Sequence, residues 1–145
     1  MRVRDLMNPH VHACGPETTV LEVAKLMKRE DVGLVPILEG GRIMGVVTDR
    51  DLALEAVTAD ALHVPIRNLI HHGPVCVDPD ASLEEAADQM VRHRVRRLCV
   101  SSQPANGALQ GVVSLDDLAS LPDASLAVRV LCELHPRLRK TRKAA

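Results

Sequence analysis

The stretch GVVTDRD, residues 45–51, recurs later in the chain as GVVSLDD, residues 111–117. Paired valines are typical of a β-strand. The hydroxyl residue that follows them in the first copy, Thr48, stands three positions before the carboxylate of Asp51. That spacing is typical of a helix start, where the hydroxyl oxygen accepts from a free backbone N–H group. Both stretches therefore predict a strand that turns directly into a helix.

The sequence around these stretches is duplicated as well. VRDLM at residues 3–7 returns as IRNLI at 66–70, and TVLEVAKLM at 19–27 returns as SLEEAADQM at 82–90. The spacing is the same in both pairs, so this part of the repeat aligns without a gap. A short insertion at 101–107, rich in Ser, Pro, Asn and Gly, is interpreted as a hairpin loop. The chain is thus predicted to contain two copies of one structural unit.

Each copy is predicted to fold as β-α-β-β-α. Thr19-x-x-Glu22 and Ser82-x-x-Glu85 are capping boxes, which start helices. Short apolar strands are expected at 34–38 and 98–100, second helices from Asp51 and Asp117, and a final helix at 126–134. The predicted fold class is α+β, with an α/β-like alternation of elements.

Three segments follow from this pattern: a first repeat at 1–60, a second at 61–121, and a C-terminal helix with a basic tail at 122–145. A repeat of roughly 60 residues buries too little apolar surface to be stable alone. We therefore expect the two repeats to pack sheet to sheet with pseudo-twofold symmetry. The same reasoning leaves apolar helical faces available for a homodimer.

Composition limits the classes of function. The formal net charge is −1, so no overall field favours nucleic acid or a membrane surface. The chain has no Phe, Tyr or Trp, so a base must be held by aliphatic groups and backbone. No apolar run reaches the roughly 20 residues that span a bilayer, and the N-terminus lacks the apolar core of a signal peptide. We expect a cytoplasmic protein without a membrane segment.

The repeated motif can bind a ligand as well as cap a helix. An ionised aspartate accepts hydrogen bonds only, so Asp51 or Asp117 can receive both hydroxyls of a vicinal diol such as a ribose. Thr48 or Ser114 can bond a phosphate or sugar oxygen at the same helix start, where the helix dipole favours anions. Gly45 and Gly111 leave room for a ligand beside the strand. A purely structural cap is the alternative, and the duplication of the motif favours binding.

The whole pattern resembles the pair of CBS (cystathionine β-synthase) domains, also called the Bateman module. The resemblance rests on the duplicated G-h-h-[ST]-x-x-D motif, on DLM at 5–7, on DVGLVPI at 31–37, and on HRVRRLCV at 93–100, where Cys99 replaces the family's usual proline. It covers roughly residues 1–121. The chain resembles in particular small stand-alone bacterial CBS proteins, including mycobacterial hypoxic-response proteins.

The resemblance implies a regulatory module with two pseudo-symmetric clefts between the repeats and no obligatory cofactor. The family's ligands are AMP, ADP, ATP, NAD or S-adenosylmethionine, which here would signal to a dimer interface or to an unidentified partner protein. Ribose and phosphate would lie against Thr48, Asp51, Ser114 and Asp117. By position, the candidates for the apolar adenine slot are Val11, Ala13, Val35, Pro36, Val75 and Leu98.

The two motifs differ in charge. Arg50 in the first copy stands where the second has Asp116. A cation beside the phosphate position favours a polyphosphate, whereas an extra carboxylate disfavours one. We therefore expect the Thr48/Asp51 cleft to be the better nucleotide site. Arg97 is a further candidate phosphate ligand, since it lies within the family-like segment.

Other functions have weaker support. His10, His12 and Cys14 alternate along the chain and could share a strand face, but we predict no metal site, and the scattered cysteines lack a C-x-x-C pair. No nucleophile and base are evident, so we predict that the protein is not an enzyme. The rival hypotheses are a ligand-free protein-interaction module and a nucleic-acid binder that acts through the basic residues of 136–145.

Overall fold

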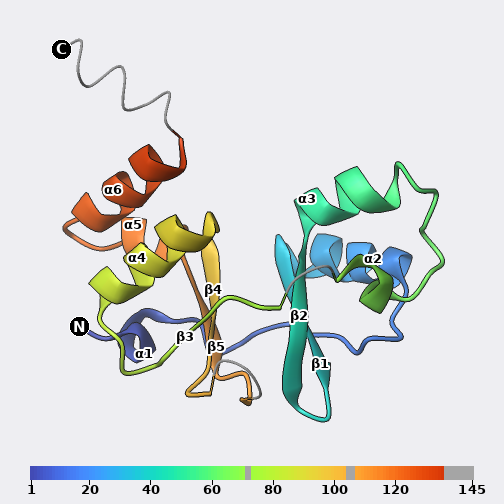
Figure 1. Ribbon diagram of the computed structural model, residues 1–145, viewed down its shortest axis with the longest axis horizontal. Helices are drawn as coiled ribbons and strands as arrows, with labels where there is room; N and C mark the ends of the chain where they lie inside the picture. Colours follow the sequence, from blue (N-terminus) through green and yellow to red (C-terminus); the bar gives the residue numbers. More distant parts are fainter. Residues whose placement is uncertain (71–72, 104–106, 136–145) are drawn as a thin grey trace. The chain divides into compact units, whose positions relative to one another are not determined.

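The computed structural model describes residues 1–70, 73–103 and 107–135 (Figure 1). The chain divides into two compact units that do not coincide with the sequence repeats. Unit 1 comprises residues 1–9, 75–104 and 110–145, and unit 2 comprises 10–74 and 105–109. The first nine residues therefore belong with the second repeat. Helices and sheets are mixed in both units, which confirms the predicted fold class.

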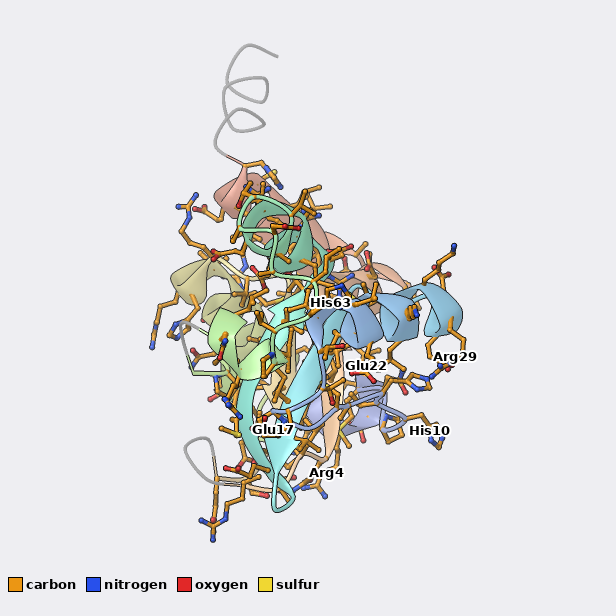
Figure 2. The ribbon with its side chains drawn as sticks, turned by 90° about the vertical axis from the view of Figure 1, so that its right-hand side faces the viewer. Arg4, His10, Glu17, Glu22, Arg29 and His63 are labelled. Atoms are coloured by element: carbon orange, nitrogen blue, oxygen red, sulfur yellow. The ribbon has the colours of Figure 1, made fainter. Side chains whose placement is uncertain are left out.

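Unit 2 is built on the antiparallel pair β1 (Leu34–Glu39) and β2 (Arg42–Thr48). The helix α2 (Val20–Glu30) starts at the predicted capping box, in which Thr19 accepts from the backbone N–H of Glu22 and the Glu22 carboxylate accepts from that of Thr19. Figure 2 shows Glu22 and Arg29 towards opposite ends of this helix. The remaining helical segments are α3 (Asp49–Asp51), the π-helix η1 (Leu52–Ala56) and the 3₁₀ turn η2 (Ile66–Leu69).

Unit 1 holds a three-stranded sheet in the order β3-β4-β5: β3 (Cys76–Val77), β4 (Arg97–Val100) and β5 (Gly111–Ser114). β3 runs parallel to β4, and β5 runs antiparallel to it. The helices are α1 (Val3–Leu6), α4 (Leu83–His93), α5 (Leu115–Ala119) and α6 (Ser125–Leu134), and α6 packs on α4 and α5 (Figure 1).

The predicted elements are present with shifted bounds. The expected first strand of repeat one is only a single parallel bridge between Cys14 and Ile37. The helices after the two motifs begin at Asp49 and Leu115, two residues earlier than expected, because the hydroxyl residue itself is the N-cap. The insertion at 101–107 does connect β4 to β5, although residues 104–106 lie outside the described part.

The two sequence repeats exchange their leading segments. Residues 3–7 and 66–70 are repeat counterparts, shifted by 63 positions (3 to 66). The N–H of Val3 donates to Ala81 O at 3.0 Å in unit 1, and the counterpart N–H of Ile66 donates to Thr18 O at 2.7 Å in unit 2. Ala81 is itself the counterpart of Thr18. Each repeat thus contributes its first helical turn to the unit formed by the other repeat.

The two exchanged segments also make matching ion pairs and apolar contacts. Arg4 pairs with Asp80 in unit 1, as its counterpart Arg67 pairs with Glu17 in unit 2. These pairs are exposed and contribute little to stability. The larger effect comes from the apolar anchors of the exchanged segments, since Val3 and Ile66 are both 0% exposed and belong to the two separate hydrophobic cores.

The exchange also explains the motif glycines. A Cβ at Gly45 would lie 2.6 Å from Cγ2 of Ile70, and one at Gly111 would lie 2.8 Å from the backbone oxygen of Asn8. In each unit the space beside the glycine is therefore filled by the exchanged segment. This differs from the sequence-based expectation that the glycines leave room for a ligand.

Candidate functional site

The first motif is a strand end that passes directly into a helical turn. Thr48, the last residue of β2, is the N-cap of α3, with extended backbone angles (φ −110°, ψ 162°). Its N–H donates to Oδ2 of Asp51 at 2.8 Å, and its Oγ1 accepts from the Asp51 N–H at 3.2 Å. A backbone hydrogen bond also holds the turn, since the N–H of Asp49 donates to Gly33 O at 3.2 Å.

The second motif repeats this geometry in unit 1. The N–H of Ser114 donates to Oδ2 of Asp117 at 2.7 Å, and Ser114 Oγ accepts from the Asp117 N–H at 3.2 Å. The N–H of Leu115 donates to the carbonyl oxygen of Arg96 at 2.8 Å, as the counterpart of the Asp49 bond. The alternative function foreseen for these residues, helix capping, is thus present at both copies.

Capping leaves part of each motif available. In the carboxylates of Asp51 and Asp117, the hydrogen bonds from described residues all go to Oδ2. The other carboxylate oxygen, Oδ1, can therefore accept from a ligand. The hydroxyls differ. Ser114 donates its hydroxyl hydrogen to Asp117 at 2.6 Å, whereas within the described chain Thr48 has no acceptor for its own. The first motif therefore retains a donor that the second already uses.

The charged residues beside the two motifs also differ, and they too leave more donors available at the first motif. Arg97 Nη2 lies 3.9 Å from Oδ2 of the exposed Asp116, so this cation has a carboxylate close by at the second motif. Arg50 is exposed and forms no ion pair with any residue that the structure describes. A guanidinium without a carboxylate partner beside a free hydroxyl is suited to a phosphate group.

The strand register places the motif hydroxyls on the sheet face opposite the hydrophobic core. In unit 2, Leu34 pairs with Thr48 and Pro36 pairs with Val46, whereas the intervening Val35 is in the core. Arg97 and Ser114 form the corresponding row in unit 1, and Leu98 is in its core. Residues two apart on a strand share a face, so Pro36 lies on the face of Thr48.

The predicted adenine-slot residues divide by burial. Val35 (0% exposed) and Leu98 (1%) pack inside the two cores, and Pro36 is buried on the motif face. Val11, Ala13 and Val75 are half-buried and retain surface that a ligand could contact. Val46 and Val112, which share the motif face, are not among the sequence candidates. Strict alternation from Thr48 and Ser114 would have found them.

Several groups outside the motifs were considered from sequence as well. His12 lies with its Nε2 3.5 Å from Oε2 of Glu30, and the described residues contain no cluster of three or more His, Cys, Asp or Glu side chains suited to a metal. In the same part of the chain, no helix has the length and apolar character needed to cross a bilayer. The basic tail at 136–145 lies outside the described residues.

Comparison with known proteins identifies the class. The family model for the CBS domain matches twice, at residues 3–57 and 66–123. The chain is 38% identical to the CBS domain-containing protein YhcV of Bacillus subtilis over 119 residues, which are 81% of this chain and 82% of that one. It is 32% identical to Hypoxic response protein 1 of Mycobacterium tuberculosis over 135 residues, 89% of this chain and 92% of the relative.

A solved structure agrees with these relatives. The CBS domain protein PAE2072 from Pyrobaculum aerophilum, complexed with AMP, superposes with a TM-score of 0.76 at 26% identity, covering 90% of this chain and 98% of that one. The chain therefore belongs to the CBS domain family. It carries two CBS domains in tandem, and the two matches take up most of its length.

Proposed function

We propose that this protein is a regulatory module that binds an adenosyl ligand at its two motifs and has no catalytic role of its own. The observation that carries the proposal is the capped turn present in both units, which leaves Oδ1 of Asp51 and of Asp117 free to accept from a ribose diol. The AMP complex of PAE2072 supports an adenine nucleotide as the ligand.

The ligand would use different groups for each of its parts. The carboxylates of Asp51 and Asp117 would accept from the ribose hydroxyls. The Thr48 hydroxyl and Arg50 would donate to phosphate oxygens, and Arg97 is the corresponding cation in unit 1. Aliphatic side chains would contact the adenine, Val11 and Pro36 in unit 2 and Val75 in unit 1, since the chain has no aromatic ring to stack on it.

The first motif is proposed as the stronger site for a phosphorylated ligand. Thr48 keeps a hydroxyl donor and Arg50 keeps an unpaired charge within the described chain, whereas Ser114 and Arg97 are engaged by Asp117 and Asp116. A ligand phosphate at the second motif must compete with two carboxylates. ATP, ADP and AMP should therefore favour Thr48 and Asp51.

Signalling requires a surface that responds to the ligand. We propose a homodimer that a further partner protein reads, because apolar side chains remain exposed on both units: Leu54 (54%) and Val57 (68%) on unit 2, Val128 (43%) and Leu131 (37%) on α6. A ligand alters such an assembly only if it binds one arrangement better than another. The proposed location is the cytoplasm, where adenine nucleotides are available.

A thermal-shift series tests the proposal, with AMP, ADP, ATP, NAD and S-adenosylmethionine added in turn. A ligand at 100 times its Kd stabilises the folded state by about 2.7 kcal/mol, which corresponds to a rise in Tm of roughly 5–10 °C for a chain of this size. Asp51→Asn keeps an oxygen for the cap but loses the charge, and it should reduce the rise. Glu22→Gln is the matched control, since it changes an equivalent capping box outside the motif. An absence of any rise in a nucleotide-free preparation would leave the rival hypothesis, a ligand-free interaction module.

A further inference from the structure

Two cysteines stand directly opposite each other in the sheet of unit 1. Cys76 of β3 and Cys99 of β4 are register partners in the parallel ladder, so their side chains project to the same face. Neighbouring strands lie about 4.8 Å apart, within the roughly 4.4–6.8 Å between Cα atoms that a disulfide spans. Neither forms a disulfide in the structure.

The fold does not require cysteine at these two positions. Their counterparts in the first repeat, again 63 residues earlier, are Ala13 and Pro36. Unit 2 has the equivalent contact between its strand segments without a pair of thiols at these positions. There the N–H of Cys14 donates to Pro36 O at 3.1 Å. The pair is therefore specific to unit 1.

The thiol pair shares a sheet face with the second motif. Cys99 pairs with Val112 across the antiparallel ladder, and Arg97 pairs with Ser114 one row along. Residues two apart on a strand project to the same side. Leu98, between Arg97 and Cys99, points into the core instead. The two thiols thus lie beside the Arg97–Ser114 pair, on the sheet face of the proposed ligand site.

The two thiols differ in access. Cys99 is 2% exposed, whereas Cys76 is half-buried at the edge of the sheet. Burial, and secondarily the nearby Cys76, raises the pKa of Cys99 to about 12, and burial also raises the pKa of Cys76. A raised pKa lowers the fraction of reactive thiolate at neutral pH, so oxidation of the pair should be faster at alkaline pH. β3 has only two residues and one neighbouring strand, so it can shift to accommodate a bond.

We propose that Cys76 and Cys99 are a redox modification site, at which a peroxide forms a disulfide that links β3 to β4 and alters ligand binding at the second motif. The Cys76 thiolate attacks a peroxide oxygen and becomes a sulfenic acid, releasing hydroxide or alcohol. The Cys99 sulfur then attacks the Cys76 sulfur and displaces water, with loss of its proton. Two thiols are oxidised, and one peroxide is reduced.

The formation of the disulfide is independent of the proposed function and can be read without a ligand. The folded protein is treated with hydrogen peroxide, alkylated and digested with trypsin. Cleavage after Arg and Lys places the four cysteines on four separate peptides: 5–25, 68–92, 98–129 and 130–137. The expected product is 68–92 joined to 98–129, formed at a rate independent of protein concentration.

Matched variants make the result specific. Cys132→Ser, on α6, should still give the linked peptides, and Cys76→Ser should not. If Cys76→Ser does not fold, the wild-type peptide map decides alone. Two results would overturn the proposed site. One is that peptides 68–92 and 98–129 stay reduced while the other two are oxidised, and the other is a link to Cys14 or Cys132.

The regulatory half rests on the proposed function and has its own readout. AMP is titrated into reduced and oxidised protein in the Asp51→Asn background, which reports on the second motif. A several-fold difference in Kd that dithiothreitol reverses is expected. Equal Kd values would refute the effect on the ligand. No AMP binding to any form of the protein, wild type included, would refute the proposed function and leave the disulfide result unaffected.

Discussion

Replacing the two motif glycines by alanine should have unequal effects. At Gly111 the added Cβ meets the backbone oxygen of Asn8 at 2.8 Å and the sulfur of Met7 at 2.9 Å. At Gly45 it meets only side-chain atoms of Ile70, the nearest at 2.6 Å. Backbone cannot rotate away, whereas a half-buried isoleucine side chain can.

The structure sets the size of each effect. Asn8 and Val112 exchange two backbone hydrogen bonds, at 2.8 and 3.0 Å, that a Cβ on Gly111 would strain. Overpacking costs about 1–3 kcal/mol, and each weakened hydrogen bond adds about 0.5–1.5 kcal/mol. We expect Gly111→Ala to lower the free energy of unfolding by about 3 kcal/mol. For Gly45→Ala, an off-rotamer Ile70 costs about 0.5–1.5 kcal/mol, largely offset by the reduced freedom of the unfolded chain, about 0.4–1 kcal/mol.

Urea unfolding of both variants measures these values, and two double variants isolate the contacts. Ile70→Ala should cost less in the Gly45→Ala background than alone, because it removes the clash. Met7→Ala should not rescue Gly111→Ala, since the Asn8 oxygen remains. The packing explanation would be refuted if both glycine variants kept the wild-type free energy of unfolding but bound AMP more weakly. That result would restore the expectation that the glycines leave room for a ligand.

Two further predictions concern the exchanged segments and the helix caps. Ile66→Ala should cost about 2–5 kcal/mol by urea unfolding, because Ile66 is 0% exposed in the core of unit 2; a cost below 1 kcal/mol would mean that the exchanged turn is not needed. Hydrogen bonds from Thr19 and Ser82 lower the pKa of Glu22 and of Glu85, so their contribution is present above the ordinary glutamate pKa and is lost as the pH falls through the lowered one. The double variant Glu22→Gln, Glu85→Gln should show a shallower loss of stability than wild type between neutral pH and pH 3, and parallel curves would contradict this.

Local signals accounted for much of the fold. The capping boxes at Thr19 and Ser82 are each decided by four consecutive residues, so sequence alone predicted both helix starts. The exchange of leading segments could not be predicted in this way. VRDLM and IRNLI have apolar and polar residues at the same positions, and nothing within either shows which repeat it packs against.

The site was predicted in part for the same reason. The duplicated motif indicated a hydroxyl and a carboxylate at each helix start, and the structure brings both pairs together. The choice of apolar residues depended on which face each side chain takes. Val35 and Leu98 were selected by position, but alternation along a strand puts them in the cores, next to Pro36 and Cys99 on the opposite face.

Calorimetric titration of AMP into the wild-type protein and into the double variant Asp51→Asn, Asp117→Asn tests the central claim most directly. A hydrogen bond to a charged group contributes about 1.5–3 kcal/mol, and each 1.4 kcal/mol is a factor of about ten in Kd. The account predicts saturable binding to wild type and an affinity at least tenfold weaker in the variant, with the fold retained. Equal affinity in the two proteins, or no binding to a nucleotide-free wild type, would contradict it.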